Sequence, residues 1–202
     1  ELDGIGPEVP LIRAEDVTVS GRLTTPVSLS LGARARLAVT GPNGAGKSSF
    51  LAVLAGELAP TSGDLDIAEL VRVGRLAQES PAPSATRVRD VYERHVGALE
   101  SAGIVLGEEA VALEDLGLFT EYDLGQRVRD LSMGQQRRLD LAMVLATRPH
   151  VLLLDEPTNH LSITLVDELT DALGATDAVV VLATHDRQLR RDIAEWPHLA
   201  LT

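Results

Sequence analysis

The sequence predicts an α/β domain with a mainly parallel core sheet, because short apolar, β-branched runs alternate with helical patterns. Three runs carry this prediction: residues 37–40, residues 151–154 and residues 178–184. The first leads into a glycine-rich turn, the second into two acids and the third into a histidine. Open α/β sheets bind ligands beyond the carboxyl ends of their strands, so we expect the three polar clusters to meet at one edge.

The remaining segments add two layers to this core. Residues 12–19 and 27–31 alternate apolar with polar side chains and predict a small antiparallel β layer. A helix is expected over residues 48–58, and residues 81–146 read as a helical lobe inserted in the core. The lobe contains one apolar stripe at helical spacing, formed by Val88, Val91, Tyr92, Val96 and Leu99.

Length and composition limit the function classes. The 202 residues, 45% of them apolar, suit one domain spanning 1–202. The net charge of −12 and the 2% aromatic content argue against broad nucleic-acid binding, so any such contact must be local. Because the chain has no long apolar run and no leader pattern, we expect a cytoplasmic domain that does not insert into a membrane.

The strongest motif is the G-x-x-x-x-G-K-S pattern at residues 41–48, between a predicted strand and a predicted helix. Its glycines let backbone amides turn inward around phosphates, and the following helix points its positive end at the same anion. The alternative is an accidental glycine-rich turn, which this strand and helix context disfavours. The motif predicts a P-loop NTPase that binds ATP and Mg²⁺. The expected nucleotide contacts are Gly41, Pro42, Asn43, Gly44, Ala45, Gly46, Lys47, Ser48 and Ser49.

Two acids and a histidine supply the remaining chemistry of a nucleotide hydrolase. Asp155 is expected to hold Mg²⁺ together with the Ser48 hydroxyl, and Glu156 to orient and deprotonate the attacking water. His185 is expected to hydrogen-bond the γ-phosphate, and Lys47 to bind the outer phosphates. Taken alone, two acids at a strand end are equally well explained by turn formation, and a lone histidine by a structural role. The phosphate loop favours the catalytic interpretation.

Residues 131–135 (LSMGQ) resemble the signature sequence of the ABC ATPases, and the other motifs follow in the order of that family. The resemblance implies that Ser132, Gly134 and Gln135 contact the γ-phosphate held by a second ABC ATPase domain. It also implies that Gln78, before the Pro- and Ser-rich hinge at residues 79–86, reaches Mg²⁺ and the water. A capping box formed by Ser132 and Gln135 is the structural alternative, and both interpretations can hold together.

Residues 156–161 (EPTNHL) are similar to the F subfamily of ABC proteins, whose members carry two such domains and act on the ribosome. The resemblance implies a translation factor or an antibiotic-resistance protein, with rRNA reached through the longer protein. Three positions depart from the pattern: Ser162 replaces an Asp, Met133 replaces a glycine, and residues 18–25 lack an aromatic residue. Arg22 is a candidate for stacking on the base in place of that aromatic residue.

Two other functions remain open from the sequence. The ATPase subunit of a membrane transporter shares the same loop, signature and acids, with its helical lobe docked on a membrane protein. A nucleotide-binding scaffold with little turnover is the third possibility. The presence of both Lys47 and Glu156 argues against the scaffold.

Overall fold

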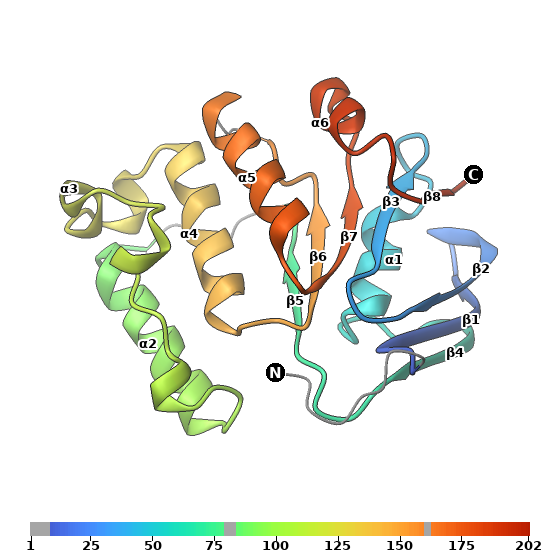
Figure 1. Ribbon diagram of the computed structural model, residues 1–202, viewed down its shortest axis with the longest axis horizontal. Coiled ribbons are helices and arrows are strands. Elements are labelled where there is room, and N and C mark those ends of the chain that lie inside the picture. Colours follow the sequence, from blue (N-terminus) through green and yellow to red (C-terminus); the bar gives the residue numbers. More distant parts are fainter. Residues whose placement is uncertain (1–8, 79–83, 160–162) are drawn as a thin grey trace.

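The computed structural model describes residues 9–78, 84–159 and 163–202 (Figure 1). Its centre is a parallel sheet of five strands in the order β5-β6-β7-β3-β8, in which chain order and spatial order differ. These strands are β3 (Arg36–Thr40), β5 (Val73–Leu76), β6 (Val151–Asp155), β7 (Val179–Ala183) and β8 (His198–Ala200). All residues of β6 and β7 are buried, as expected for central parallel strands that are covered on both faces.

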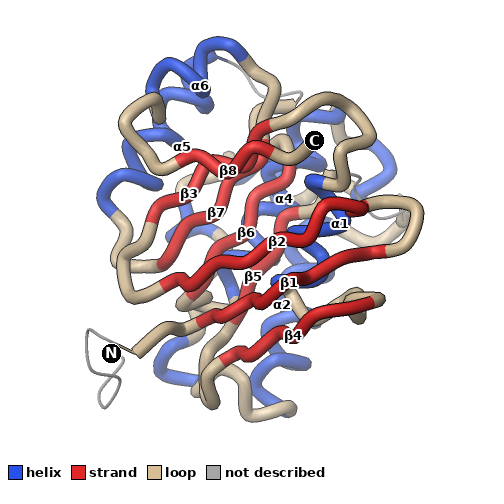
Figure 2. Tube along the Cα trace, turned by 90° about the vertical axis from the view of Figure 1, so that its right-hand side faces the viewer, coloured by secondary structure: helices blue, strands red, loops and turns tan. Residues whose placement is uncertain are grey.

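A second, antiparallel sheet lies beside one face of the parallel sheet (Figure 2). Its three strands, in the order β2-β1-β4, are β1 (Ile12–Val19), β2 (Leu23–Leu31) and β4 (Ser62–Ile67). Helix α1 (Lys47–Leu54) packs between the two sheets, where the side chains of Phe50 and Leu51 are fully buried. The alternation of side chains along β6 places Leu153 in this core and Leu152 in the core on the opposite face.

Helices cover that opposite face. These are α4 (Met133–Ala146), α5 (Ile163–Ala175) and α6 (Arg187–Asp192). Leu141, Leu169 and Leu189 contribute one side chain from each helix to the apolar cluster against the sheet. Within the described part of the chain, every helix is too short or too polar to cross a bilayer.

A helical lobe extends from one side of the sheet (Figure 1). It contains α2 (Val88–Ser101), the short α3 (Glu121–Leu124), and three 3₁₀ turns, Gly107–Glu109, Glu114–Leu116 and Val128–Asp130. Helix α4 joins the lobe to the sheet, because Leu139 packs with α2 in the lobe's own apolar cluster while Leu141 packs on the sheet.

The predicted fold class is confirmed, including the parallel core, the antiparallel layer and the helices between residues 88 and 146. Strands β4 and β8 were not predicted. The helix expected to reach residue 58 ends at Leu54, because Gly56 adopts φ +72° and turns the chain. Most of the expected hinge at residues 79–86 lies outside the described residues.

Candidate nucleotide site

A cavity of about 510 Å³ opens at the carboxyl ends of β3, β5, β6 and β7. Most of the site residues predicted from the sequence meet there, although they are far apart along the chain. The lining residues are Gly21, Arg22, Asn43, Gly44, Gly46, Lys47, Ser48, Ser49, Gln78, Asp155, Glu156 and His185. Gly41, Pro42 and Ala45 belong to the same loop without lining the cavity, and Ala45 is buried.

The glycine-rich loop between β3 and α1 needs a residue without a side chain at its last glycine. Gly46 has φ +90°, and a Cβ atom placed on it would lie 2.3 Å from the carbonyl oxygen of Arg22. The loop therefore packs directly on the β1–β2 turn. Lys47 is buried, and its ammonium group donates hydrogen bonds of 3.0 Å to the carbonyl oxygens of Gly41 and Pro42. Its cationic head is thus held within the loop, and it lines the cavity.

Asp155, the last residue of β6, supplies a buried carboxylate beside the loop. Burial raises the pKa of Asp155 above its usual range, and the Ser48 hydroxyl opposes this shift by hydrogen bonding to the carboxylate. The Oδ2 atom of Asp155 is buried and has no hydrogen-bond partner among the described residues. A hydroxyl and an underused carboxylate oxygen at the edge of one cavity fit Mg²⁺, which takes oxygen ligands from few protein groups. Gln78 adds a third oxygen donor to the lining.

Glu156 follows Asp155 in a strained backbone conformation, with φ +48°. Its buried carboxylate makes three polar contacts. The backbone amide of His185 and the hydroxyl of Thr184 each donate to Oε2 at 3.1 Å. The Nδ1 atom of His185 lies 2.7 Å from Oε1. The two residues predicted to be the base and the γ-phosphate contact are therefore in direct contact with each other.

The signature residues are placed elsewhere, at the start of α4, and do not line the cavity. Ser132 and Gln135 form a capping box, in which the Ser132 Oγ accepts from the Gln135 amide at 3.2 Å and the Gln135 side chain accepts from the Ser132 amide at 2.9 Å. The Gln135 side chain also donates to Asp123 Oδ1 at 2.6 Å. Burial tends to raise the pKa of Asp123, but hydrogen bonds from Thr120 and Gln135 outweigh it and hold the pKa below its usual value.

Sequence reasoning missed two residues that support the site. The first is Thr184, whose hydroxyl donates a hydrogen bond to Glu156. The only sequence feature that could have indicated this residue is its position directly before His185. Arg137 of α4 is buried, and its guanidinium donates to the carbonyl oxygens of Ala77, Asp155 and Glu156. Burial lowers the pKa of Arg137. A single arginine thus joins the helix that begins at the signature to the strand ends that carry the acids.

The family model described as "ABC transporter" matches residues 24–159. The chain belongs to the ABC transporter family. The fold agrees with this ABC assignment. A solved ATP-binding cassette, in a dimeric post-hydrolysis state bound to ADP and Pi, superimposes with a TM-score of 0.72 at 21% identity and covers 95% of this chain and 94% of that one. The sequence-based prediction of an ABC ATPase domain is confirmed.

Two curated relatives of this ABC domain carry the resemblance further. The tylosin resistance ATP-binding protein TlrC of Streptomyces fradiae is 44% identical over 189 residues, which are 93% of this chain and 33% of TlrC. ABC transporter F family member 4 of Arabidopsis thaliana is 37% identical over 163 residues, which are 76% of this chain and 21% of that protein. The predicted F-subfamily relationship is therefore confirmed. This ABC domain spans a third or less of the length of either relative.

Proposed function

We propose that this ABC domain binds Mg·ATP and hydrolyses it when paired with a second ABC domain, driving a conformational change in a cytoplasmic F-subfamily protein that acts on the ribosome. The observation that carries the proposal is one cavity that gathers Lys47, Ser48, Asp155, Glu156 and His185. Phosphoryl transfer depends on positioning and on electrostatic stabilisation, which these residue types supply. The ribosomal part rests on the F-subfamily relationship and on the role of TlrC in tylosin resistance.

Each residue has a defined task in this proposal. The loop amides and the Lys47 ammonium bind the β- and γ-phosphates, and Arg22 lies at the cavity where it can stack on the base. Mg²⁺ held by Ser48, Gln78 and Asp155 would supply positive charge to the phosphates. Glu156 accepts the proton of the attacking water, and His185 donates a hydrogen bond to the γ-phosphate.

The signature completes a different site. Because Ser132 and Gly134 stand at the start of the 14-residue α4 and outside this cavity, the exposed Ser132 hydroxyl and the Gly134 amide are available to a γ-phosphate bound by another ABC domain. The pair of domains is therefore the hydrolytic unit, and a single domain binds Mg·ATP with slow turnover.

Calorimetry of Lys47→Ala tests the nucleotide site. We expect binding of Mg·ATP to be lost, and we expect Arg34→Ala to retain it, because Arg34 is exposed, pairs with Asp177 and does not line the cavity. Lys47 is the only lysine of the sequence, so acylation by an amine reagent followed by mass spectrometry reports on it directly. ATP should protect Lys47 from the reagent. Equal labelling with and without ATP would contradict the assignment.

Sedimentation of the longer protein with ribosomes tests the partner. We expect the Glu156→Gln form, loaded with ATP, to remain with the ribosomal pellet, since a pair that cannot hydrolyse stays closed. Recovery of a membrane permease in place of ribosomes would support the transporter alternative and overturn the ribosomal assignment.

A further inference from the structure

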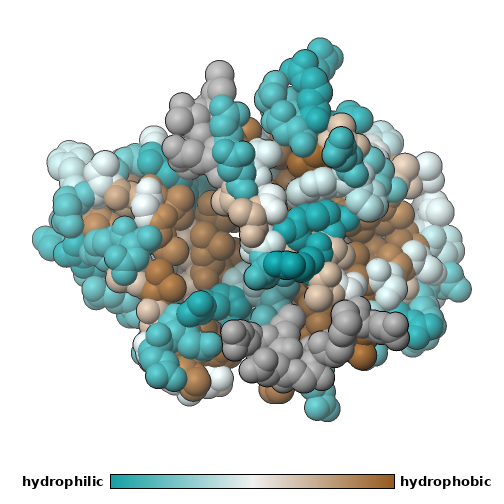
Figure 3. Space-filling view, viewed as in Figure 1, coloured by the Kyte–Doolittle hydropathy of each residue, from teal (hydrophilic) through white to brown (hydrophobic). Residues whose placement is uncertain are grey.

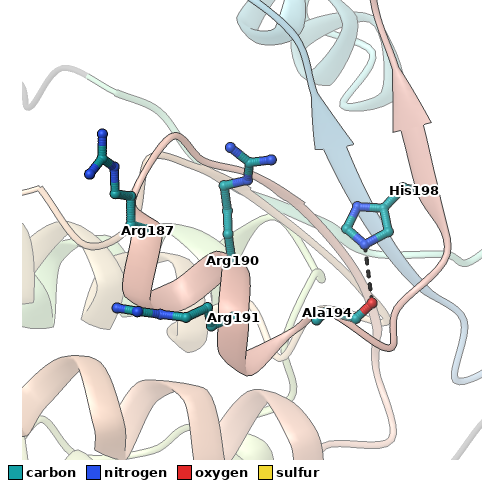
Figure 4. Close-up of a pocket in the computed structure, with 5 residues that line it drawn as sticks. All are labelled: Arg187, Arg190, Arg191, Ala194 and His198. Atoms are coloured by element: carbon teal, nitrogen blue, oxygen red, sulfur yellow. Dashed lines mark hydrogen bonds between the residues drawn. The ribbon is translucent and has the colours of Figure 1, made fainter.

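Helix α6 presents a compact basic surface in an otherwise acidic chain. Arg187, Arg190 and Arg191 are all exposed on this six-residue helix, and the net charge of the chain is −12. Together with Ala194 and His198 they line a hollow of about 480 Å³ (Figure 4). Arg187 and Arg190 extend to the same side of the helix, and His198 lies across the hollow, with Nε2 3.3 Å from the carbonyl oxygen of Ala194. We call these three arginines and His198 the α6 patch.

The positive charges of the α6 patch are not neutralised within the described structure. The side chains of Arg187 and Arg190 make no hydrogen bond or ion pair with any described residue, and the Arg191 side chain donates only to the neutral Gln188 side chain at 3.0 Å. Other exposed arginines differ, since Arg34 and Arg89 each pair with a carboxylate. Like charges three and four residues apart on a helix repel one another, so the α6 patch favours a negatively charged ligand.

The two acids that adjoin the arginines of the α6 patch in the sequence, Asp186 and Asp192, already have other partners. Asp186 caps α6 by accepting hydrogen bonds of 2.8 Å from the amides of Gln188 and Leu189. Asp192 accepts one of 2.8 Å from the Gln188 side chain. The hollow itself is lined without a carboxylate. The arginines of the α6 patch therefore remain available to a ligand from outside the chain.

The chemistry of the α6 patch points to phosphates in series. A guanidinium group matches a phosphate through two parallel hydrogen bonds, and three such groups on one helix suit a chain of phosphates better than a single anion. We propose that the α6 patch binds the phosphodiester backbone of RNA. This inference rests on the proposed ribosomal function, which supplies RNA as the polyanion, and it locates a contact within the ABC domain itself.

The position of the α6 patch ties it to the nucleotide site. Only Asp186 separates Arg187 from His185, and the Asp186 amide bonds the Thr184 hydroxyl, which in turn bonds Glu156. One short segment after β7 therefore carries both contacts. His185 at its start faces the nucleotide site, and the arginines of α6 that follow would bind RNA.

The test is fluorescence anisotropy of this chain with a labelled single-stranded RNA of about 20 nucleotides. The triple variant Arg187→Gln, Arg190→Gln, Arg191→Gln removes the charges and keeps good helix formers. The matched control, Arg13→Gln, Arg89→Gln, Arg129→Gln, loses the same charge at exposed arginines that pair with carboxylates. The logarithm of the affinity falls with the logarithm of the salt concentration with a slope of about −0.7 per phosphate contact. For three contacts, raising the salt from about 50 to 200 mM therefore weakens RNA binding about 20-fold. We expect the triple variant to lose affinity about tenfold or more, together with about two units of salt slope.

Other results would overturn the proposal. Equal weakening in the control variant would mean general electrostatics, and unchanged binding in the triple variant would mean that RNA, if bound, lies elsewhere. Binding to phosphatidylglycerol vesicles but not to RNA would assign the α6 patch to a lipid surface. Calorimetry with Mg·ATP on the same proteins separates this inference from the proposed function: the triple variant should bind nucleotide normally, and failure of the unmodified chain to bind it would count against the nucleotide site alone.

Discussion

The Nδ1 atom of His185 lies 2.7 Å from Oε1 of Glu156, while the backbone amide of His185 holds Oε2 of the same carboxylate. His185, which follows β7, thus contacts both carboxylate oxygens of Glu156, which follows β6. Because Nδ1 and the backbone amide of His185 both face Glu156, Nε2 is the ring nitrogen that can face the γ-phosphate.

Glu156→Gln should lower ATP turnover by about 100-fold or more and leave Mg·ATP binding intact, because an amide cannot accept the proton of water. Steady-state phosphate release by the paired domains measures the first effect, and calorimetry measures the second. Glu195→Gln, at an exposed position, is the control that keeps normal turnover. Turnover by Glu156→Gln at the unmodified rate would remove Glu156 as the base.

Thr184→Val keeps the shape of the side chain and removes the hydroxyl that donates to Glu156. We expect a loss of about 1–3 kcal/mol in the free energy of unfolding, because a buried carboxylate oxygen loses a donor. Urea denaturation measures the loss, and Thr184→Ser should recover most of it. A Val variant as stable as the Ser variant would mean that this hydroxyl is dispensable.

Ser132→Ala removes the side-chain cap of α4. A lost N-cap costs about 1 kcal/mol, which corresponds to a fall of about 2–4 °C in Tm for a domain of this size. Scanning calorimetry measures this fall. Nucleotide affinity of the single domain should not change, since Ser132 lies outside the cavity, whereas turnover by the paired domains should fall. A change in the nucleotide affinity of the single domain would contradict the assignment of the signature to the site of a second domain.

Asp123→Asn tests the hydrogen-bonded carboxylate behind the signature. Because the pKa of Asp123 is lowered in the folded chain, its ionised form stabilises the fold above the ordinary Asp pKa of about 3.9, and this stabilisation is lost as the pH falls through the folded value. The unmodified chain should therefore melt at a higher temperature than the variant at pH 7. The difference should shrink below about pH 4, as thermal melts across this range would show. A difference that is constant with pH would point to lost shape complementarity instead of lost charge.

The parts of the fold that sequence predicts well have strong local signals. Residues 151–154 and 178–184 are continuous apolar runs, and both became fully buried strands. Strand β4 has an exposed start and only half-buried Leu65 and Ile67, so its pattern resembles a loop. Strand β8 has three residues at the sheet edge, and its pairing with β3 determines it more than its own composition.

The residues of the site also differ in how well the sequence predicts them. The motif residues Lys47, Ser48, Asp155 and His185 are recognisable because their spacing is local, and the sheet brings them together. Arg137 contacts partners 18 or more positions away, and Asp123 reaches Gln135 12 positions away, so no local pattern reveals these contacts. Arg137 lies within the helical lobe expected at residues 81–146, but its burial against the strand ends became evident only in three dimensions.

The guanidinium of Arg137 places a mechanical constraint on this molecule. Arg137 belongs to α4, and its guanidinium donates to carbonyl oxygens directly before Gln78 and at the end of β6. A rotation of the helical lobe that carries α4 must either drag these two loops along or break all three bonds. A force on the lobe is therefore transmitted through Arg137 to the chain beside Gln78 and to the two acids.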